Sequence, residues 1–277
     1  MDASTRIAAE VKTTPSIKDI EDTRYIVFDT ESIPDGLLVA RVKYPEENLT
    51  PEEAIERAQK EEKAHSFTGS DFLPITFQKP VAISVLRVSK DLLPMALHCL
   101  DAPSFRTVEM VKLFWLGIEK FNRASLVTFN GRGFDLPLLE LAAFEHGISC
   151  EKYFASDKRN RYRSTNIDLF DLMTNQGACK MVGGLNLLAK KIGLPGKMGT
   201  TGNDVYPMYK AGQLQEINDY CLCDTLDTYF VFLRSRVLIG SIQLEQEKEI
   251  TARAVAWLQE RVAEFPILNK YLQQRQG

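Results

Sequence analysis

The sequence predicts a single α/β domain in which helices flank a mixed β-sheet. With 44% hydrophobic and 26% charged residues over 277 positions, the composition is that of an ordinary globular protein. That composition excludes collagen, a coiled-coil rod and wholesale disorder. Short apolar runs typical of strands come first, and helical periodicity then alternates with a further strand. This order favours a sheet that mixes antiparallel and parallel strands.

The predicted strands begin with the apolar run at residues 25–28, which ends in polar residues 29–31 and is stopped by Pro34. Residues 81–88 and 95–100 are rich in β-forming side chains and predict the next two strands, with turn residues between them. These two strands form a meander that follows the first strand.

The predicted helices follow this meander, and a short strand at residues 125–129 separates the first two of them. Pro137 in a first turn and Gly147 after a last turn mark the ends of one helix. Apolar periodicity predicts helices at residues 105–121, 136–146, 185–192, 213–238 and 244–258. Residues 51–63 are charged almost all round, which predicts a solvated helix that packs little.

The chain divides into three parts on these patterns. Residues 1–22 are polar, lack apolar periodicity and contain Pro15, which favours a flexible leader. Residues 23–240 form the main domain, with an insertion at about residues 35–80, and residues 241–277 form a C-terminal helical extension.

Charge and cysteine content limit the classes of function. The net charge of −3 gives no general attraction to nucleic acid or acidic membranes, so any polyanion must be bound locally. No apolar stretch reaches the roughly 18 residues of a membrane span, and the first residues lack the apolar core of a signal peptide. We therefore expect a cytoplasmic protein, whose five scattered cysteines are reduced thiols.

Asp29 and Glu31 are the first candidate site residues. They stand two positions apart on the first strand, so both carboxylates point to one face while Thr30 points to the other. An Asp-x-Glu pair occurs by chance about once in a chain of this size, so spacing alone favours a surface pair without function. Their place at the end of a buried strand favours a bound cation, because buried carboxylates are costly without a positive partner.

Asp135, Tyr220 and Asp224 are the next candidates. Asp135 stands where a strand joins a helix, so it could cap that helix, present its carboxylate at the edge of the sheet, or do both. Tyr220 and Asp224 are four residues apart in the long helix and share one of its faces. The alternative for this pair is a core tyrosine beside a surface aspartate.

Four carboxylates on separate elements form a donor set for hard cations. Oxygen ligands of this kind predict Mg²⁺ or Mn²⁺, and four carboxylates suit two ions. Two ions about 4 Å apart can activate a water and stabilise both oxygens of an in-line phosphoryl displacement.

Three motifs in the chain resemble those of one nuclease superfamily. They are Asp29-Thr30-Glu31, Asn130-x-x-x-Phe134-Asp135 and Tyr220-x-x-x-Asp224. They resemble the three exonuclease motifs of the DnaQ-like superfamily, in its DEDDy subclass. Residues 184–233 are similar, well beyond the motifs, to the predicted 3′-5′ exonucleases related to the proofreading domain of family B DNA polymerases. The resemblance covers about residues 24–238 and leaves the leader and the last helix outside.

The resemblance implies a ribonuclease H-like fold, with a mixed, mostly five-stranded central sheet flanked by helices. It implies a metal-dependent enzyme that hydrolyses a nucleic-acid strand from its 3′ end by a two-metal-ion mechanism and releases nucleoside 5′-monophosphates. Our first hypothesis is that this strand is single-stranded DNA. Asp29, Glu31 and Asp224 would bind one metal ion. Asp29 would also reach the second ion, and Asp135 would complete the site.

Tyr220 would position the attacking water, and Asn130 and Phe134 would lie near the terminal nucleotide of the substrate. The sibling DEDDh subclass has a histidine five residues before the last aspartate, where this chain has Asp219. Tyr220 therefore decides the subclass.

The most basic segment, residues 158–163, has two interpretations. Its cations could bind phosphates while Tyr162 stacks on a base, or the segment could be a solvated loop. The cations are Lys158, Arg159, Arg161 and Arg163. Nearby lysines would offset the repulsion between the carboxylates and substrate phosphates; they are Lys180, Lys190, Lys191 and Lys197. Asp168 and Asp171 could be further ligands, but a helix cap is favoured.

Two alternatives to the DNA exonuclease stay open. An exoribonuclease that trims RNA 3′ ends would use the same chemistry, because contacts to the 2′-hydroxyl distinguish the two sugars and no motif here names them. A nucleic-acid-binding module that has lost catalysis is less favoured, since all five site residues are present. Protein partners are not indicated by any motif.

Overall fold

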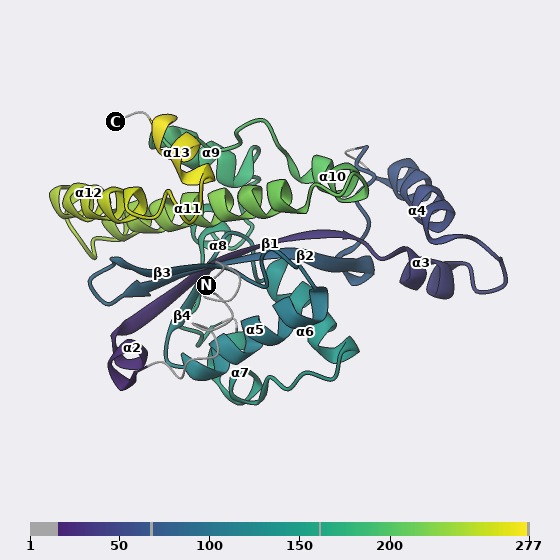
Figure 1. Cartoon of the computed structure of the whole chain (residues 1–277), viewed down its shortest axis with the longest axis horizontal. Helices are drawn as coiled ribbons and strands as arrows, with labels where there is room; N and C mark the ends of the chain where they lie inside the picture. Colours follow the sequence, from purple (N-terminus) through teal and green to yellow (C-terminus); the bar gives the residue numbers. More distant parts are fainter. Residues whose placement is uncertain (1–15, 67–68, 161, 276–277) are drawn as a thin grey trace.

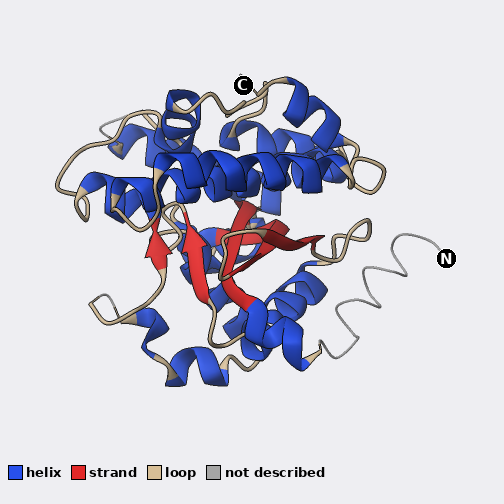
Figure 2. Ribbon diagram, turned by 90° about the vertical axis from the view of Figure 1, so that its left-hand side faces the viewer, coloured by secondary structure: helices blue, strands red, loops and turns tan. Residues whose placement is uncertain are grey.

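The computed structural model describes residues 16–66, 69–160 and 162–275. A central sheet lies between two layers of helices, and the long helix α11 (Leu214–Leu238) crosses one face of the sheet (Figures 1 and 2). No helix within the described residues is long and apolar enough to cross a membrane.

The sheet has five strands in the order β3-β2-β1-β4-β5. They are β1 (Thr23–Pro34), β2 (Gln78–Ser89), β3 (Pro94–Cys99), β4 (Ser125–Thr128) and β5 (Ile167–Asp168). The β1–β2 and β2–β3 pairs are antiparallel, whereas β1–β4 and β4–β5 are parallel. This mixed five-stranded sheet, with helices on both faces, confirms the predicted fold class and agrees with a ribonuclease H-like fold.

The layer on the α11 side holds the larger core cluster. Leu222, Leu226 and Phe230 of α11 are buried there with Val27 of β1 and Val127 of β4. A fully buried side chain of this kind contributes about 1.5–3 kcal/mol to stability. The other helices of the layer are α8 (Leu169–Thr174), α9 (Gly184–Lys191), α10 (Val205–Lys210), α12 (Leu244–Gln259) and α13 (Ile267–Gln273), with the 3₁₀ turn η3 (Gly202–Asp204).

The opposite face of the sheet packs against α5 (Thr107–Lys120) and α6 (Asp135–Glu145) (Figure 1). Trp115 of α5 is fully buried and donates its indole N–H to the main-chain oxygen of Leu139, which joins the two helices. The layer is completed by α2 (Ile17–Asp22), α7 (Glu151–Ala155) and the 3₁₀ turn η2 (Asp157–Arg159).

The insertion forms two helices with a core of their own. α3 (Gly36–Lys43) and α4 (Pro51–His65) pack together and are followed by the 3₁₀ turn η1 (Ile75–Phe77). Ala54 and Ala58 on one narrow face of α4 are buried against Val39. The predicted charged helix is therefore confirmed, but it packs more than its composition indicates.

The predicted helices at residues 105–121, 136–146, 185–192, 213–238 and 244–258 are confirmed as α5, α6, α9, α11 and α12. β1 is longer than the predicted run at residues 25–28, because it continues to pair with β2 as far as Pro34. Residues 17–22, expected within a flexible leader, form α2, which Ser16 and Asp19 begin with a capping box.

Candidate active site

The alternation of side chains along β1 separates the first candidate residues onto two faces. Val27 faces the α11 layer, whereas Ile26 and Phe28 face α5 and α6. With a period of two, Asp29 and Glu31 follow Val27 toward α11, and Thr30 follows Phe28 toward α6. The prediction that the two carboxylates share a face is confirmed, since both meet Asp224 of α11.

The carboxylates of Asp29, Glu31 and Asp224 form one cluster, in which one oxygen from each lies within 4.8 Å of the others. Tyr220, one turn before Asp224, donates its hydroxyl to the Asp224 carboxylate. Between them in sequence, the Cys221 thiol donates to the main-chain oxygen of Asp29 over 3.2 Å, which ties α11 to β1 at the site. The five cysteines are unpaired, as expected.

Asp135 approaches the cluster from the other face of the sheet. Its Oδ1 accepts a hydrogen bond of 2.6 Å from the Thr30 hydroxyl, and only 3% of its surface is exposed. The charge of Asp135 raises the pKa of Asp29, second only to burial. The capping alternative is wrong, because α6 begins after Phe134 without a side-chain cap. Thr30 therefore holds Asp135 beside Asp29, outside the three-carboxylate cluster.

The pairing of β4 explains why the second motif reaches β1. Residues Ser125–Val127 of β4 run parallel to Tyr25–Val27 of β1, and β4 ends at Thr128. The chain that leaves β4 therefore passes beside the part of β1 that carries Asp29 and Glu31. The register of two parallel strands thus brings Asp135 to the site.

The site carries negative charge that its own cations do not balance. Burial, reinforced by the neighbouring carboxylates, raises the pKa of Asp29 and Glu31 well above their usual values. Burial also raises the pKa of Asp135 and of Asp224 to about 7. Carboxylates whose pKa values are raised in this way favour the binding of a cation, which stabilises their ionised form. Oxygen donors fit Mg²⁺ or Mn²⁺, so these residues fit the predicted metal site.

These shifts predict how stability depends on pH. Between pH 4 and 7 the metal-free folded protein holds protons on Asp135 and Asp224 that the unfolded chain has released, so its free energy of unfolding falls as pH rises. We expect Mn²⁺ to raise Tm more at pH 8 than at pH 5, by about 5 °C or more, because ionised carboxylates bind the cation. Thermal unfolding followed by circular dichroism, with EDTA or Mn²⁺, measures this. An equal effect of Mn²⁺ at both pH values would contradict the metal site.

Asp168 and Asp171 support the second motif and are not part of the carboxylate cluster. Asp168 caps α8, as predicted, and also accepts the main-chain N–H of Asn130 over 2.8 Å and of Arg132 over 3.0 Å. Asp171 forms a 2.6 Å ion pair with Arg132. Asn130 has the left-handed backbone angle φ of 61°, which asparagine tolerates. The two aspartates therefore hold the loop that presents Asn130.

Within its described residues, the basic segment does not form the row of free cations that one of the two interpretations requires. Lys158 is only 9% exposed and donates its ammonium to the main-chain oxygen of Ala124, so phosphate binding by Lys158 is wrong. Arg159 forms two hydrogen bonds with the carboxylate of Glu140, at 2.9 and 3.0 Å. Arg161 lies outside the described residues, and Arg163 is exposed. Burial of Lys158 and pairing of Arg159 favour a structural role for the described part of this segment.

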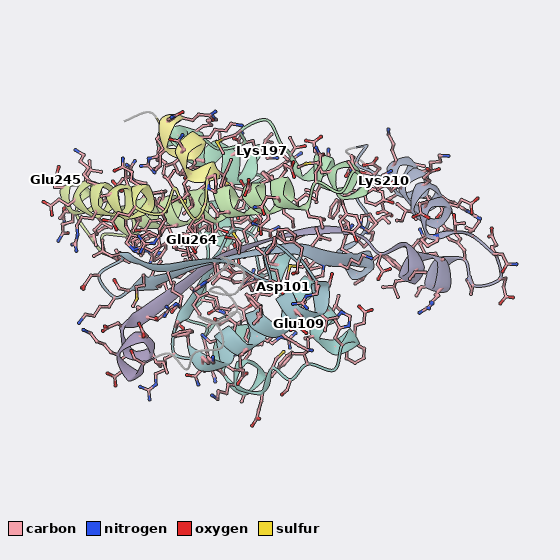
Figure 3. The ribbon with its side chains drawn as sticks, in the orientation of Figure 1. Asp101, Glu109, Lys197, Lys210, Glu245 and Glu264 are labelled. Carbon is pink, nitrogen blue, oxygen red and sulfur yellow. The ribbon has the colours of Figure 1, made fainter. Side chains whose placement is uncertain are left out.

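Lys197 supplies positive charge at the cluster instead. Its charge lowers the pKa of Glu31 and of Asp224, against the raising effect of burial. It lines a cavity of about 420 Å³ together with Tyr220 and Asp224. Figure 3 shows Lys197 on the α11 side of the sheet. The sequence predicts this role for four lysines without distinguishing Lys197, because its position beside the carboxylates depends on the loop after α9.

Phe72 is a residue beside the site that the sequence alone does not single out. Its ring lies 6.0 Å from the ring of Phe134, and 43% of its surface is exposed. Its neighbour Leu73 is 1% exposed and belongs to the core of the insertion. The insertion therefore places an exposed aromatic side chain beside the second motif without needing it for its own packing.

Comparison with known proteins adds one match. A family model described as a predicted 3′-5′ exonuclease related to the exonuclease domain of PolB matches residues 70–275. The matched part contains Asp135, Tyr220 and Asp224, and it begins after β1. It continues through α12 and α13, so the expectation that the resemblance ends near residue 238 is wrong. No curated protein matches the chain.

Proposed function

Since this chain belongs to the family of predicted 3′-5′ exonucleases related to the exonuclease domain of PolB, we propose that it degrades single-stranded DNA in a metal-dependent reaction. Each turnover releases a nucleoside 5′-monophosphate from the 3′ end. The family is one of hydrolases that act on nucleic acid. The observation that carries the proposal is the cluster of Asp29, Glu31 and Asp224, in which one carboxylate oxygen from each residue lies within 4.8 Å of the others.

The metal ligands in this proposal are the clustered carboxylates and Asp135. Asp29, Glu31 and Asp224 would hold one ion, and Asp29 and Asp135 would hold a second. Bound there, Mg²⁺ or Mn²⁺ would lower the pKa of water and stabilise the negative charge that develops on the scissile phosphate. Thr30 keeps the Asp135 carboxylate in place through its 2.6 Å hydrogen bond.

Tyr220 would orient the attacking water through its phenol oxygen, while the phenol hydrogen is donated to Asp224. Burial, followed by the charges of Asp224, Glu31 and Asp29, raises the pKa of its phenol. The phenol therefore stays protonated at neutral pH. A protonated phenol can orient the attacking water, but it cannot act as the general base that removes a proton from that water. Packing of Tyr220 against the cluster around Ile33 and Ile217 keeps the ring in place.

Lys197 would attract the substrate phosphate. Its side chain is exposed and borders the cavity that Asp224 also lines. A positive charge here offsets the repulsion between the carboxylates and the phosphodiester. Positive charge at the mouth of a cleft also raises the local concentration of an anionic substrate.

The terminal nucleotides would contact Asn130, Phe134 and Phe72. Asn130 is exposed on the loop that Asp168 holds, and Phe134 immediately precedes Asp135. Phe134 and Phe72 offer two partly exposed rings beside the site. Rings of this kind stack on unpaired bases, which favours a single strand over a duplex whose bases are already stacked.

Replacing Phe72 tests this contact. We expect Phe72→Ala to raise KM for a single-stranded oligonucleotide by about 5- to 150-fold, because stacking on one base contributes about 1–3 kcal/mol. The rate at saturating substrate should fall less than KM rises. Steady-state kinetics on strands of increasing length measure both constants. Phe144→Ala is the matched control, because Phe144 lies on α6 and is 87% exposed. Equal KM values for the two variants would remove Phe72 from the substrate site.

The function itself is tested with matched DNA and RNA strands of one sequence. The purified chain should release mononucleotides from the 3′ end of 5′-labelled single-stranded DNA in Mg²⁺ or Mn²⁺, and EDTA should stop the reaction. Faster degradation of the RNA strand would replace the proposed substrate by RNA. Binding without any turnover in Mn²⁺ would show a binding module instead.

A further inference from the structure

Asp227 lies on the same face of α11 as two residues of the candidate site. Positions i, i+4 and i+7 share one face of a helix, and Tyr220, Asp224 and Asp227 have this spacing. Asp227 borders the same cavity as these two residues and Lys197. It is nevertheless only 1% exposed, so it cannot meet the substrate directly. A carboxylate that is buried at this point can act on the site only from behind the proposed metal ligands.

The two oxygens of Asp227 have different surroundings. Oδ1 accepts a 2.7 Å hydrogen bond from the hydroxyl of Tyr271. Oδ2 is buried and has no hydrogen-bond partner among the described residues. Burial raises the pKa of Asp227 to about 6, although the hydrogen bond from Tyr271 and the positive charges of Arg275 and Lys190 lower it. A buried oxygen without a partner costs free energy, which a functional arrangement would explain.

Tyr271 makes the C-terminal helix part of this arrangement. It belongs to α13, is fully buried and packs in the core cluster on the α11 side of the sheet. Its hydroxyl fixes the orientation of Asp227 from a segment 44 residues further along the chain. Through this hydrogen bond, α13 therefore fixes Asp227, which lies one helical turn from Asp224.

We propose that Asp227 supports the metal site from behind its ligands: held by Tyr271, its negative charge strengthens the binding of a divalent cation at Asp224. This inference rests on the proposed function, because it takes Asp224 as a metal ligand. Asp227 stands three residues after Asp224 on one face of α11 and borders the same cavity, so its negative charge would attract a cation bound at Asp224. Residues behind metal ligands typically change metal affinity by 10- to 100-fold.

Two variants test the proposal on the full chain. Asp227→Asn removes the charge and keeps an acceptor for Tyr271, whereas Tyr271→Phe keeps the ring and removes the hydrogen bond. We expect Asp227→Asn to raise the Kd for Mn²⁺ by about 10- to 100-fold, and Tyr271→Phe to raise it less. Isothermal titration calorimetry with Mn²⁺ alone measures affinity without substrate or turnover. Degradation of single-stranded DNA at saturating Mn²⁺ should fall by a smaller factor than the affinity.

A matched pair of controls exists on the opposite face of the sheet. The Tyr153 hydroxyl donates to Glu140 over 2.9 Å, and Tyr153 is 1% exposed. Tyr153→Phe and Glu140→Gln make the same chemical changes away from the carboxylate cluster, so they should leave Mn²⁺ affinity unchanged.

The outcomes separate this inference from the proposed function. A parent protein that binds Mn²⁺, with an Asp227→Asn variant that binds it equally well but unfolds at a lower Tm, would make Asp227 a structural tie and overturn the inference alone. A parent protein that binds no Mn²⁺ would overturn both. If one variant fails to fold, the other decides, since they perturb different groups.

Discussion

Loss of a single clustered carboxylate should abolish nuclease activity while the fold stays intact. We expect Asp29→Ala or Asp224→Ala to reduce the rate of DNA degradation by about 1000-fold or more, because several kcal/mol of charge stabilisation at the phosphate depend on the bound cations. Release of mononucleotides from labelled single-stranded DNA at saturating Mg²⁺ measures the rate.

Repulsion among the clustered carboxylates also predicts how their replacement changes stability. The carboxylates of Asp29, Glu31 and Asp224 repel one another in the metal-free protein, so Asp29→Asn should raise its Tm rather than lower it. Asp219→Ala is the control on the same helix, since Asp219 accepts a hydrogen bond from Gln215 and is not part of the cluster. Near-normal turnover in Asp29→Ala or Asp224→Ala, with metal present, would contradict the site.

Tyr220→Phe should slow the chemical step by about 10- to 1000-fold, or roughly 1.4–4 kcal/mol at the transition state. The phenylalanine ring keeps the packing but cannot orient a water. Because the phenol also holds down the pKa of Asp224, the variant should need more Mg²⁺ to reach saturation. Single-turnover cleavage of a 3′-labelled strand at saturating Mg²⁺ measures the loss in rate of the chemical step, because the metal requirement no longer limits the reaction there.

Tyr229→Phe provides the matched control for that experiment. Tyr229 lies on the same helix and donates its hydroxyl to the main-chain oxygen of Leu92 over 2.8 Å, away from the cluster. Its loss should lower Tm and leave the rate unchanged. If Tyr220→Phe behaves in the same way as Tyr229→Phe, Tyr220 is a packing residue and the DEDDy mechanism has no support here.

Local patterns were sufficient to predict the elements with strong periodicity. α5, α6, α11 and α12 contain at least 11 residues each, long enough for the helical pattern of apolar side chains to repeat. β5 has only two residues, and α7 has five, so neither carries a period that a sequence reader could recognise. Their existence depends on pairing with β4 and packing against α5.

Residues that act through distant partners could not be assigned from their neighbours in sequence. Thr30 and Asp135 are 105 positions apart, and only the pairing of β4 with β1 brings them together. Lys158 had the same sequence signal as an exposed phosphate-binding lysine, because burial against Ala124 leaves no trace in the local pattern. Lys197 carried no stronger signal than its neighbours, yet its charge reaches Glu31 and Asp224.

The sequence by itself determined the chemical identity of the site and its local geometry. A strand period of two placed Asp29 and Glu31 on one face, and a helical spacing of four placed Tyr220 beside Asp224, because both follow from backbone geometry within a few residues. Only the tertiary structure decided which carboxylates share a cluster, and which charges and rings surround them. Those contacts join segments far apart in the chain, and the energy that selects them comes from burial of the whole core rather than from any local pattern.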